Sequence, residues 1–333
     1  MKLFKFRRKV KMTPREAIQI LEDRMNASVL GQEHIVSRLV MSLLADGNIL
    51  VEGLPGLAKT RAVRAMADAI EGKFSRIQFT PDLLPLDVTG AEQLNVEDGK
   101  KVRHFYKGPI FGNIILADEI NRAPAKIQSA MLEAMEEKQV TVAGQTHKLP
   151  ELFIVMATQN PLEQEGTFPL SEAQKDRFFM HVKIDYPKMD AEFQMINLIQ
   201  KERFTPSEPH EKVSQEMIFA ARREVAQVRF SETIGRYIVE LVFATRYPLR
   251  YSKQLEVMID VGVSPRATLA LIQCAQANAW MHGREEMTVE DVRAVIHDVF
   301  HHRLVISEHA LTNKRTPEEI IDIILTQVPT PKV

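Results

Sequence analysis

The sequence predicts an α/β fold with a parallel five-stranded sheet, followed by a smaller domain made of helices alone. Short apolar runs of strand length alternate with segments of helical periodicity up to Pro187, and strand signals fade beyond it. A glycine-rich loop separates the first apolar run from an amphipathic helix. Strands that alternate with helices are typical of a parallel sheet covered on both faces. We therefore expect an α/β core over residues 13–187 and a helical domain over residues 188–333.

The elements of the core can be assigned in chain order. Thr13 is the expected N-cap of a first helix that begins with proline and has Glu16 as its third residue, and a second helix is expected over residues 32–44. A helix around residues 127–135 separates the third strand from the fourth, and residues 139–149 alternate around Ala-Gly as a β-hairpin does. The five strands are expected at residues 48–52, 76–80, 113–117, 152–157 and 178–184.

The composition limits the classes of function. A hydrophobic content of 45% and a charged content of 26% are typical of a globular protein, and the formal net charge of −1 does not favour nucleic acid as the main partner. The single cysteine, Cys274, excludes an internal disulfide and fits a reducing cytoplasm. No apolar run is long enough for a membrane span, and the basic residues 1–12 are expected to form a flexible, solvated tail.

A candidate phosphate-binding loop follows the first strand. It matches the pattern G-x-x-x-x-G-K-[ST] except that Ala58 replaces the second glycine. Ala58 stands where the chain enters a helix at negative φ, so its methyl group fits at little cost. We expect Lys59 to reach the β- and γ-phosphates of a nucleoside triphosphate and the Thr60 hydroxyl to bind Mg²⁺. The residues of this loop are Gly53, Leu54, Pro55, Gly56, Leu57, Ala58, Lys59 and Thr60.

Two acidic residues end the third strand, after the apolar run at 114–117. In a parallel sheet they would lie at the carboxyl edge, beside the phosphate loop. Asp118 is expected to hold Mg²⁺ through its water shell, and Glu119 to polarise the attacking water. Solvated acids after a strand are the alternative, but the glycine loop about sixty residues upstream favours a metal and catalytic site.

Two further polar residues stand at the ends of apolar segments. Asn160 closes the fourth strand, where its side chain would hydrogen-bond the γ-phosphate or the attacking water. Arg177 precedes the fifth strand, directly after Asp176. Taken alone, this arginine is expected to make an ordinary surface pair with Asp176.

In this order the motifs resemble those of AAA+ ATPases and, more narrowly, of the MoxR family. The resemblance covers most of residues 29–270 and implies a P-loop core followed by a helical lid. Members of this family commonly carry alanine before the lysine of the loop. The sequence departs from the family at Ser171 and Lys175, two polar positions that tolerate these residues. The stretches that carry the resemblance are EGLPGLAKT, RIQFTPDLLPLDVTG, YKGPIFGNIILADEINRAPAKIQSAMLEAMEEKQVTVAGQTHKLP, ATQNPLEQEGTFPLSEAQKDRFFMHV and VGVSPRA.

The resemblance implies roles for the residues at the predicted strand ends. Lys59 and Thr60 fall on the Walker A positions. Asp118 and Glu119 fall on the Walker B positions, and Asn160 falls on the sensor-1 position. ATP and Mg²⁺ are therefore the expected cofactors.

The resemblance also assigns residues outside the loop. Arg177 falls where relatives place an arginine finger that reaches the γ-phosphate of the neighbouring subunit, and Arg266 falls on the sensor-2 position of the lid. Ser264 and Pro265 should begin a helix with Arg266 in its first turn. Residues 80–112 resemble an insert within the second helix, and the hairpin at 139–149 resembles the insert before sensor 1. The segment Val29, Leu30 and Gly31 resembles one that packs against adenine.

The implied activity is Mg²⁺-dependent ATP hydrolysis at the subunit interfaces of a homo-oligomeric ring, for which the family suggests a hexamer. ATP is expected between the core and the lid of one subunit, completed by Arg177 of the next. The work done would be chaperone-like remodelling, maturation or metal loading of client proteins, together with a partner that carries a von Willebrand factor A domain.

Two other functions stay open. A transcription regulator or DNA-acting motor of the AAA+ type would need a DNA-binding module, and the last 65 residues contain no clear helix-turn-helix with a basic face. A nucleotide-gated scaffold would bind ATP with little turnover. Glu119 argues against the scaffold, and a turnover assay decides between them.

Three histidines near the carboxyl end, His297, His301 and His302, include a helical i,i+4 pair. No carboxylate motif such as H-E-x-x-H accompanies them. A polar helix end is therefore expected there rather than a metal site.

Overall fold

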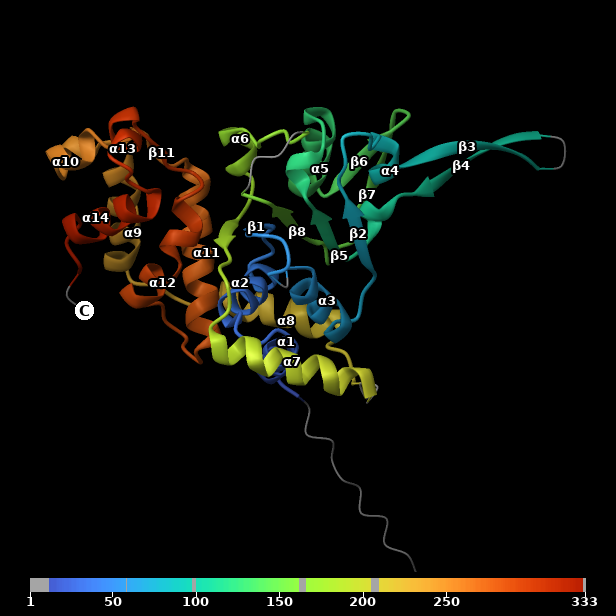
Figure 1. The fold of residues 1–333 in the computed structure, drawn as a ribbon, viewed down its shortest axis with the longest axis horizontal. Coiled ribbons are helices and arrows are strands. Elements are labelled where there is room, and N and C mark those ends of the chain that lie inside the picture. Colours follow the sequence, from blue (N-terminus) through green and yellow to red (C-terminus); the bar gives the residue numbers. More distant parts are fainter. Residues whose placement is uncertain (1–11, 58, 98–99, 162–165, 205–209, 332–333) are drawn as a thin grey trace, which may run out of the picture.

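The computed structural model describes residues 12–57, 59–97, 100–161, 166–204, 210–331. Two sequence predictions, the conformation of Ala58 and the flexible tail over residues 1–11, lie outside these ranges. Figure 1 shows a central sheet with helices above and below it and a group of C-terminal helices at the left.

The central sheet has five parallel strands, as the sequence predicts. Their order is β2-β5-β8-β1-β9, and every neighbouring pair is parallel. The carboxyl ends of all five strands therefore meet at one edge of the sheet, and the amino ends meet at the other. The strands are β1 (Ile49–Glu52), β2 (Phe74–Gln78), β5 (Ile114–Asp118), β8 (Ile154–Gln159) and β9 (Met180–Lys183).

Both faces of the sheet are buried, because alternate side chains of each strand enter different apolar cores. Ile49 and Val51 of β1 face one core, whereas Leu50 faces the other. The first core is formed with α1 (Pro14–Ser28), α2 (Glu33–Leu44), α3 (Lys59–Ala69) and α8 (Gln215–Ala226). The second is formed with α5 (Ala125–Glu137) and the 3-10 helices η1 (Pro109–Phe111) and η2 (Ile120–Arg122).

Two hairpins are inserted into the core. The longer one extends away from the molecule at the right of Figure 1, and Gly90 at its base is required, because a Cβ there would lie 2.0 Å from the Tyr106 carbonyl oxygen. The shorter hairpin confirms the prediction for residues 139–149. The elements are α4 (Pro85–Thr89), β3 (Gly90–Glu97) and β4 (Lys100–Lys107), and then β6 (Gln139–Val142) and β7 (Gln145–Lys148).

The chain beyond Pro187 is helical, with one short antiparallel strand pair added to the all-helical prediction. No helix in the described part of the chain is long and apolar enough to cross a membrane. The elements are α7 (Met189–Phe204), α9 (Glu232–Arg246), η3 (Pro248–Arg250), α10 (Lys253–Glu256), β10 (Ile259–Val261), α11 (Pro265–Met281), α12 (Val289–Phe300), β11 (Val305–Ile306), α13 (Glu308–Thr312) and α14 (Pro317–Gln327), while α6 (Glu172–Lys175) precedes β9.

The C-terminal helices pack directly on the core. α8 contacts α1 and α2, α11 contacts α2, and α12 contacts β9, so one apolar core continues across Pro187. A buried ion pair joins the two parts: Arg38 Nε of α2 lies 2.7 Å from Asp298 Oδ2 of α12. Because α11 packs on α2, these contacts set the position of its first turn, which carries Arg266, relative to the sheet. A domain boundary at Pro187 stays a prediction.

Candidate functional site

The phosphate loop lies between β1 and α3, at the carboxyl edge of the sheet. Gly56 has a φ of +88°, a conformation that glycine adopts without strain. Lys59 Nζ donates to the carbonyl oxygens of Gly53 at 2.6 Å and Gln159 at 3.2 Å, so the ammonium lies across the loop. Burial lowers the pKa of Lys59, although the charges of nearby acids oppose this shift.

Asp118 lies at the end of β5 and is buried. Its Oδ1 accepts a hydrogen bond from Thr158 Oγ1 at 2.7 Å, and its Oδ2 accepts one from Arg76 Nη2 at 2.7 Å. These two hydrogen bonds, one from β8 and one from β2, hold the Asp118 carboxylate in one orientation. Asp118 and the hydroxyl of Thr60 are both hard oxygen donors, the type that Mg²⁺ prefers, so the donor set fits this ion.

Glu119 follows in a left-handed conformation, with a φ of +58°. Its backbone N–H donates to Thr158 Oγ1 at 2.9 Å, which holds the turn in place. The carboxylate accepts from Gln78 Nε2 at 3.2 Å and from Arg122 Nη1 at 3.1 Å. The left-handed turn therefore separates the Glu119 side chain from that of Asp118. The hydrogen bonds from Gln78 and Arg122 hold the Glu119 carboxylate in place.

Asn160 lies one residue beyond β8, and Gln159 pairs with Glu52, the last residue of β1. Asn160 is therefore beside the phosphate loop, and its carbonyl oxygen accepts from Asn121 Nδ2 at 3.4 Å. The structure thus gathers five predicted site residues at the carboxyl edge: Lys59, Thr60, Asp118, Glu119 and Asn160.

Arg177 lies at the opposite edge. β9 begins at Met180, which pairs with Ile49, the first residue of β1, so Arg177 precedes the amino end of the sheet. Gly53 follows the last residue of β1. The four steps from Ile49 to Gly53 span about 13 Å along the strand direction, and Arg177 lies beyond the Ile49 end of that span. In its own chain, Arg177 is therefore separated from the phosphate loop by the length of the sheet.

Arg266 lies with Arg177 and not with the phosphate loop. Ser264 caps α11 as predicted, since its Oγ accepts from the Arg266 N–H at 3.2 Å. Arg177 Nη1 lies 3.4 Å from Glu136 Oε2, and Arg266 Nη2 forms an ion pair with the other oxygen of the same carboxylate. One glutamate of α5 therefore holds both arginines.

Asp176, at the same edge, binds residues of the C-terminal helical part of the chain. Its carboxylate accepts from Ser264 Oγ at 2.8 Å and from Arg303 Nε at 2.9 Å, and Arg266 Nη1 lies 3.6 Å away. Arg177, which the sequence taken alone would pair with Asp176, pairs with Glu136 instead. Glu136 and the lid contacts of Asp176 have no local sequence signal, because the partners are far apart along the chain.

The segment predicted to pack against adenine is partly enclosed. Val29 is buried, and Gly31 has a φ of +73°. A Cβ at Gly31 would lie 2.5 Å from the Ala191 Cβ of α7, so only glycine fits this approach. Leu30, between them, is half-buried. The adenine contact itself stays a prediction for all three residues.

A parallel sheet with a lysine-bearing glycine loop after one strand and an Asp-Glu pair after another defines a P-loop nucleoside triphosphatase. Residues 48–180 match the ATPase family associated with various cellular activities (AAA), and residues 253–324 match an AAA lid domain.

Similarity to known proteins identifies the family within the AAA ATPases more narrowly. "Chaperone MoxR1" of Mycobacterium tuberculosis is 40% identical over 306 residues, which cover 92% of this chain and 80% of that protein. "Uncharacterized protein YeaC" of Bacillus subtilis is 42% identical over 312 residues, or 93% of each chain. A 2.00 Å crystal structure of a candidate ATPase from Cytophaga hutchinsonii has a TM-score of 0.88 and 40% identity, covering 96% of both chains. The chain belongs to the MoxR family of AAA+ ATPases, and its activity is ATP hydrolysis.

Proposed function

We propose that ATP is hydrolysed between subunits, with the carboxyl edge of one chain facing the amino edge of the next. The pairing of Arg177 and Arg266 on Glu136, at the edge opposite the phosphate loop, carries this proposal. In one chain these arginines do not share an edge with Lys59. In a head-to-tail ring, one heterologous contact repeated around the axis would bring the two edges together.

The roles of the residues in this joint site follow from their chemistry. Lys59 and the loop amides bind the phosphates, and Glu119 accepts the proton of the attacking water while Asn160 orients that water or the γ-phosphate. Arg177 and Arg266 of the neighbouring subunit stabilise the charge that develops on the γ-phosphate. Thr60 and Asp118 would hold Mg²⁺, which supplies further positive charge at the β- and γ-phosphates.

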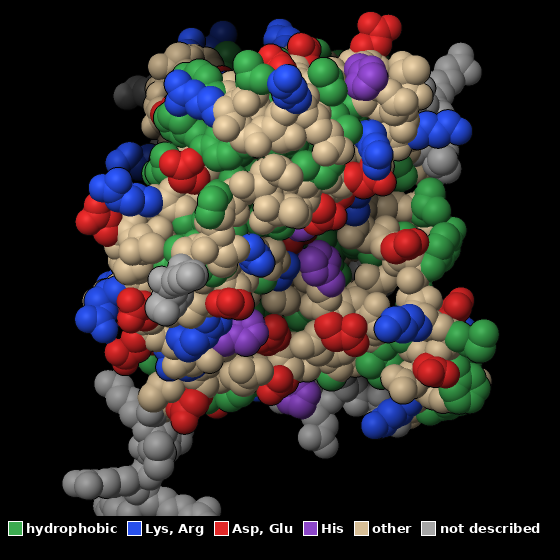
Figure 2. Space-filling view, turned by 90° about the vertical axis from the view of Figure 1, so that its left-hand side faces the viewer, with side chains coloured by type: hydrophobic (Ala, Val, Ile, Leu, Met, Phe, Trp, Pro, Cys, Tyr) green, Lys and Arg blue, Asp and Glu red, His purple; other side chains and the backbone are tan. Residues whose placement is uncertain are grey.

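The work that hydrolysis drives is proposed to be chaperone-like. The M. tuberculosis relative is named a chaperone. Family resemblance suggests a ring of six subunits that acts in the maturation or metal loading of client proteins. A separate partner protein with a von Willebrand factor A domain would act together with this ring. The β3–β4 hairpin, with exposed Leu94 and Tyr106, is the candidate surface for a client or partner. On the face seen in Figure 2, Lys and Arg are interspersed with Asp and Glu, unlike the single-sign surface expected of a DNA-binding protein.

The subunit-interface site can be tested by mixing two inactive variants. Glu119→Gln removes the base and Arg177→Ala removes the arginine. In a mixed ring, an intact Glu119 from one variant meets an intact Arg177 from the other at about one interface in four. We expect ATP turnover to return to a measurable part of the wild-type rate.

The mixing experiment has a matched control. Glu119→Gln mixed with the double variant Glu119→Gln/Arg177→Ala contains no intact Glu119, and turnover should stay at background. If Arg177 served its own chain, the first mixture would also stay inactive, since every chain would still lack one group.

A separate experiment addresses the partner. Glu119→Gln with ATP should hold the assembled state, and affinity capture from the native cell extract should recover a protein with a von Willebrand factor A domain. Recovery of no such protein in either nucleotide state would contradict this part of the proposal.

A further inference from the structure

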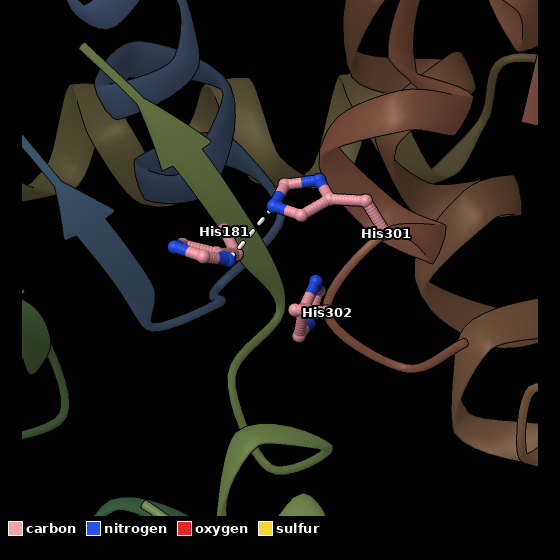
Figure 3. Close-up of side chains that lie close together, drawn as sticks. All are labelled: His181, His301 and His302. Atoms are coloured by element: carbon pink, nitrogen blue, oxygen red, sulfur yellow. Dashed lines mark hydrogen bonds between the residues drawn. The ribbon is translucent and has the colours of Figure 1, made fainter. Parts of the chain in front are cut away.

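Three buried histidines come together between β9 and the end of α12. His181 lies on β9, His301 is the C-cap of α12, and His302 follows it. One ligand nitrogen from each lies within 4.8 Å of the other two. Figure 3 shows the three rings turned toward one another. The predicted polar helix end is right for His297, which pairs with Asp322 at the surface, but wrong for His301 and His302, which are buried.

The outer nitrogen of each ring faces an acceptor. His301 Nδ1 lies 2.6 Å from the His297 carbonyl oxygen, and His302 Nε2 lies 3.3 Å from the Phe178 carbonyl oxygen. A carbonyl oxygen only accepts, so each of these two nitrogens carries a hydrogen. His181 Nε2 lies 3.4 Å from a carboxylate oxygen of Glu52, within ion-pair distance but without the geometry of a hydrogen bond.

Two inner nitrogens, His301 Nε2 and His302 Nδ1, are then left with their lone pairs. His181 Nδ1 and His301 Nε2 are 2.7 Å apart, and His302 Nδ1 is buried without a hydrogen-bond partner among the described residues. A neutral imidazole carries one hydrogen, and His181 can place it on Nδ1, donating to His301, or on Nε2, toward Glu52. In the second tautomer three lone pairs converge in one buried space, and in both tautomers the nitrogen of His302 stays unsatisfied.

We propose that His181, His301 and His302 bind one divalent transition-metal ion of the Zn²⁺ type, at a site distinct from the Mg²⁺ site. Neutral imidazole is a preferred ligand of Zn²⁺, Cu²⁺ and Ni²⁺. Bound histidines usually donate their other N–H to a carboxylate or a backbone carbonyl, and all three rings here have such a group in place. The Glu52 carboxylate also offsets part of the ion's charge.

The geometry needs only small side-chain movements. Zn–N bonds of about 2.0–2.1 Å in a tetrahedron place neighbouring nitrogens about 3.4 Å apart. The 2.7 Å pair would therefore open and the longer separations, up to 4.8 Å, would close. Three protein ligands leave the fourth position to a water molecule.

A metal at this position would tie the sheet to the lid. β9 leads out of the segment that carries Arg177, and His301 and His302 end α12 of the lid. The tie would hold the amino edge and the lid in one arrangement.

The test uses the full chain, freed of any histidine tag and of metal, with Co²⁺ and Zn²⁺ as probes. We expect one Co²⁺ per chain with the visible absorption of a tetrahedral site, displaced by Zn²⁺. His302→Gln should weaken binding by more than ~100-fold, because it removes a ligand rather than a supporting group. His297→Gln, which alters a surface histidine one turn away, should bind as the wild type does.

A second measurement needs no variant and covers the case in which His302→Gln fails to fold. X-ray absorption at the zinc edge of the wild-type protein should show imidazole scattering from about three nitrogens at ~2.0–2.1 Å. Failure to bind close to one ion per chain, equal binding by His302→Gln, or a shell made only of oxygen would each overturn the proposal.

Discussion

In the proposed ring, the two edges of the central sheet would carry complementary halves of a catalytic site. The carboxyl edge presents acids and a lysine from one chain, and its acids are held by arginines: Asp118 by Arg76, and Glu119 by Arg122. The amino edge presents Arg177 and Arg266, which are held by acids of their own chain. In this arrangement the carboxyl edge would bind nucleotide alone, whereas the arginines of the amino edge would act only on the phosphates of a neighbouring subunit.

This difference has a consequence for assembly. In the proposed ring, Glu136 and Asp176 would neutralise the arginines until a stronger anion, the triphosphate of a neighbouring subunit, approaches. Turnover should then depend on contact between edges, whereas ATP binding should depend on the carboxyl edge alone.

The largest effect is expected from Arg177→Ala. Loss of an arginine finger typically costs ~10³–10⁵ in kcat, so turnover should nearly vanish while the Kd for ATP changes little. Lys59→Ala, at the other edge, should instead abolish ATP binding. Equilibrium ATP binding and steady-state hydrolysis, measured on both variants, give the comparison. Arg177→Lys should not restore the rate, because an ammonium lacks the planar fork of a guanidinium.

The comparison would fail if Arg177→Ala lost ATP binding in the isolated subunit. That result would place this arginine beside the loop of its own chain. Normal turnover in the same variant would remove Arg177 from the reaction altogether.

Glu119→Gln should have the next largest effect. Removal of a general base costs ~10²–10⁴ in rate, and the amide keeps the shape of the side chain, so ATP should remain bound. Single-turnover hydrolysis measures the loss directly. Glu172→Gln, an exposed acid of α6, serves as the matched control and should behave as wild type. Unchanged hydrolysis by Glu119→Gln would exclude Glu119 as the base.

Glu136→Gln should have a smaller effect, through the placement of the arginines. Because this carboxylate holds both Arg177 and Arg266, its loss should lower kcat by ~10–100-fold with the Kd for ATP unchanged. The neighbouring exposed Glu137 offers a matched control, and Glu137→Gln should leave kcat unchanged. An equal loss in both variants would point to a general charge effect and not to positioning.

Local signals in the sequence were sufficient for the fold and for the carboxyl edge. The strand ahead of Gly53 and the helix after it, and the caps at Thr13 and Ser264, all leave patterns within a few residues. The site residues of this edge each lie at the end of a strand or in the segment after it, so topology alone gathers them. Sequence resemblance named the residues of the amino edge but could not place them.

Contacts between distant residues could not be predicted in the same way. Glu136 is an exposed residue of an amphipathic helix, and nothing near it in the sequence signals the two arginines. His181 and His301 are 120 residues apart, and their contact leaves no periodic trace in one sequence. From the sequence, His297, His301 and His302 are the histidines that lie close together. In the fold, His301 and His302 lie beside His181 instead of His297.

The smallest effect on turnover is expected from Asp298→Asn. This variant tests whether the contact between the lid and the core affects stability without affecting ATP hydrolysis. Asp298 of α12 lies 2.7 Å from Arg38 Nε and 3.4 Å from His34 Nε2, both on α2. The asparagine leaves the half-buried Arg38 without a charged partner, and we expect a loss of about 2 kcal/mol in the free energy of unfolding. Turnover per folded subunit should be retained. Asp322→Asn, at the exposed pair with His297, should cost much less.

The same variant has a pH signature. Burial by itself raises the pKa of Asp298, but the hydrogen bond to His34 and the charge of Arg38 bring it below its ordinary value of 3.8. A carboxyl group with a lowered pKa stabilises the fold above the unfolded-state pKa, and this stabilisation is lost as the pH falls through the folded-state value. Denaturant unfolding from pH 6 down to the acid limit of the fold should therefore show a steeper loss for wild type than for Asp298→Asn. Parallel curves for the two proteins would mean that the Asp298 carboxylate contributes no net stabilisation, and that the packing of α11 on α2 and of α12 on β9 holds the lid against the core.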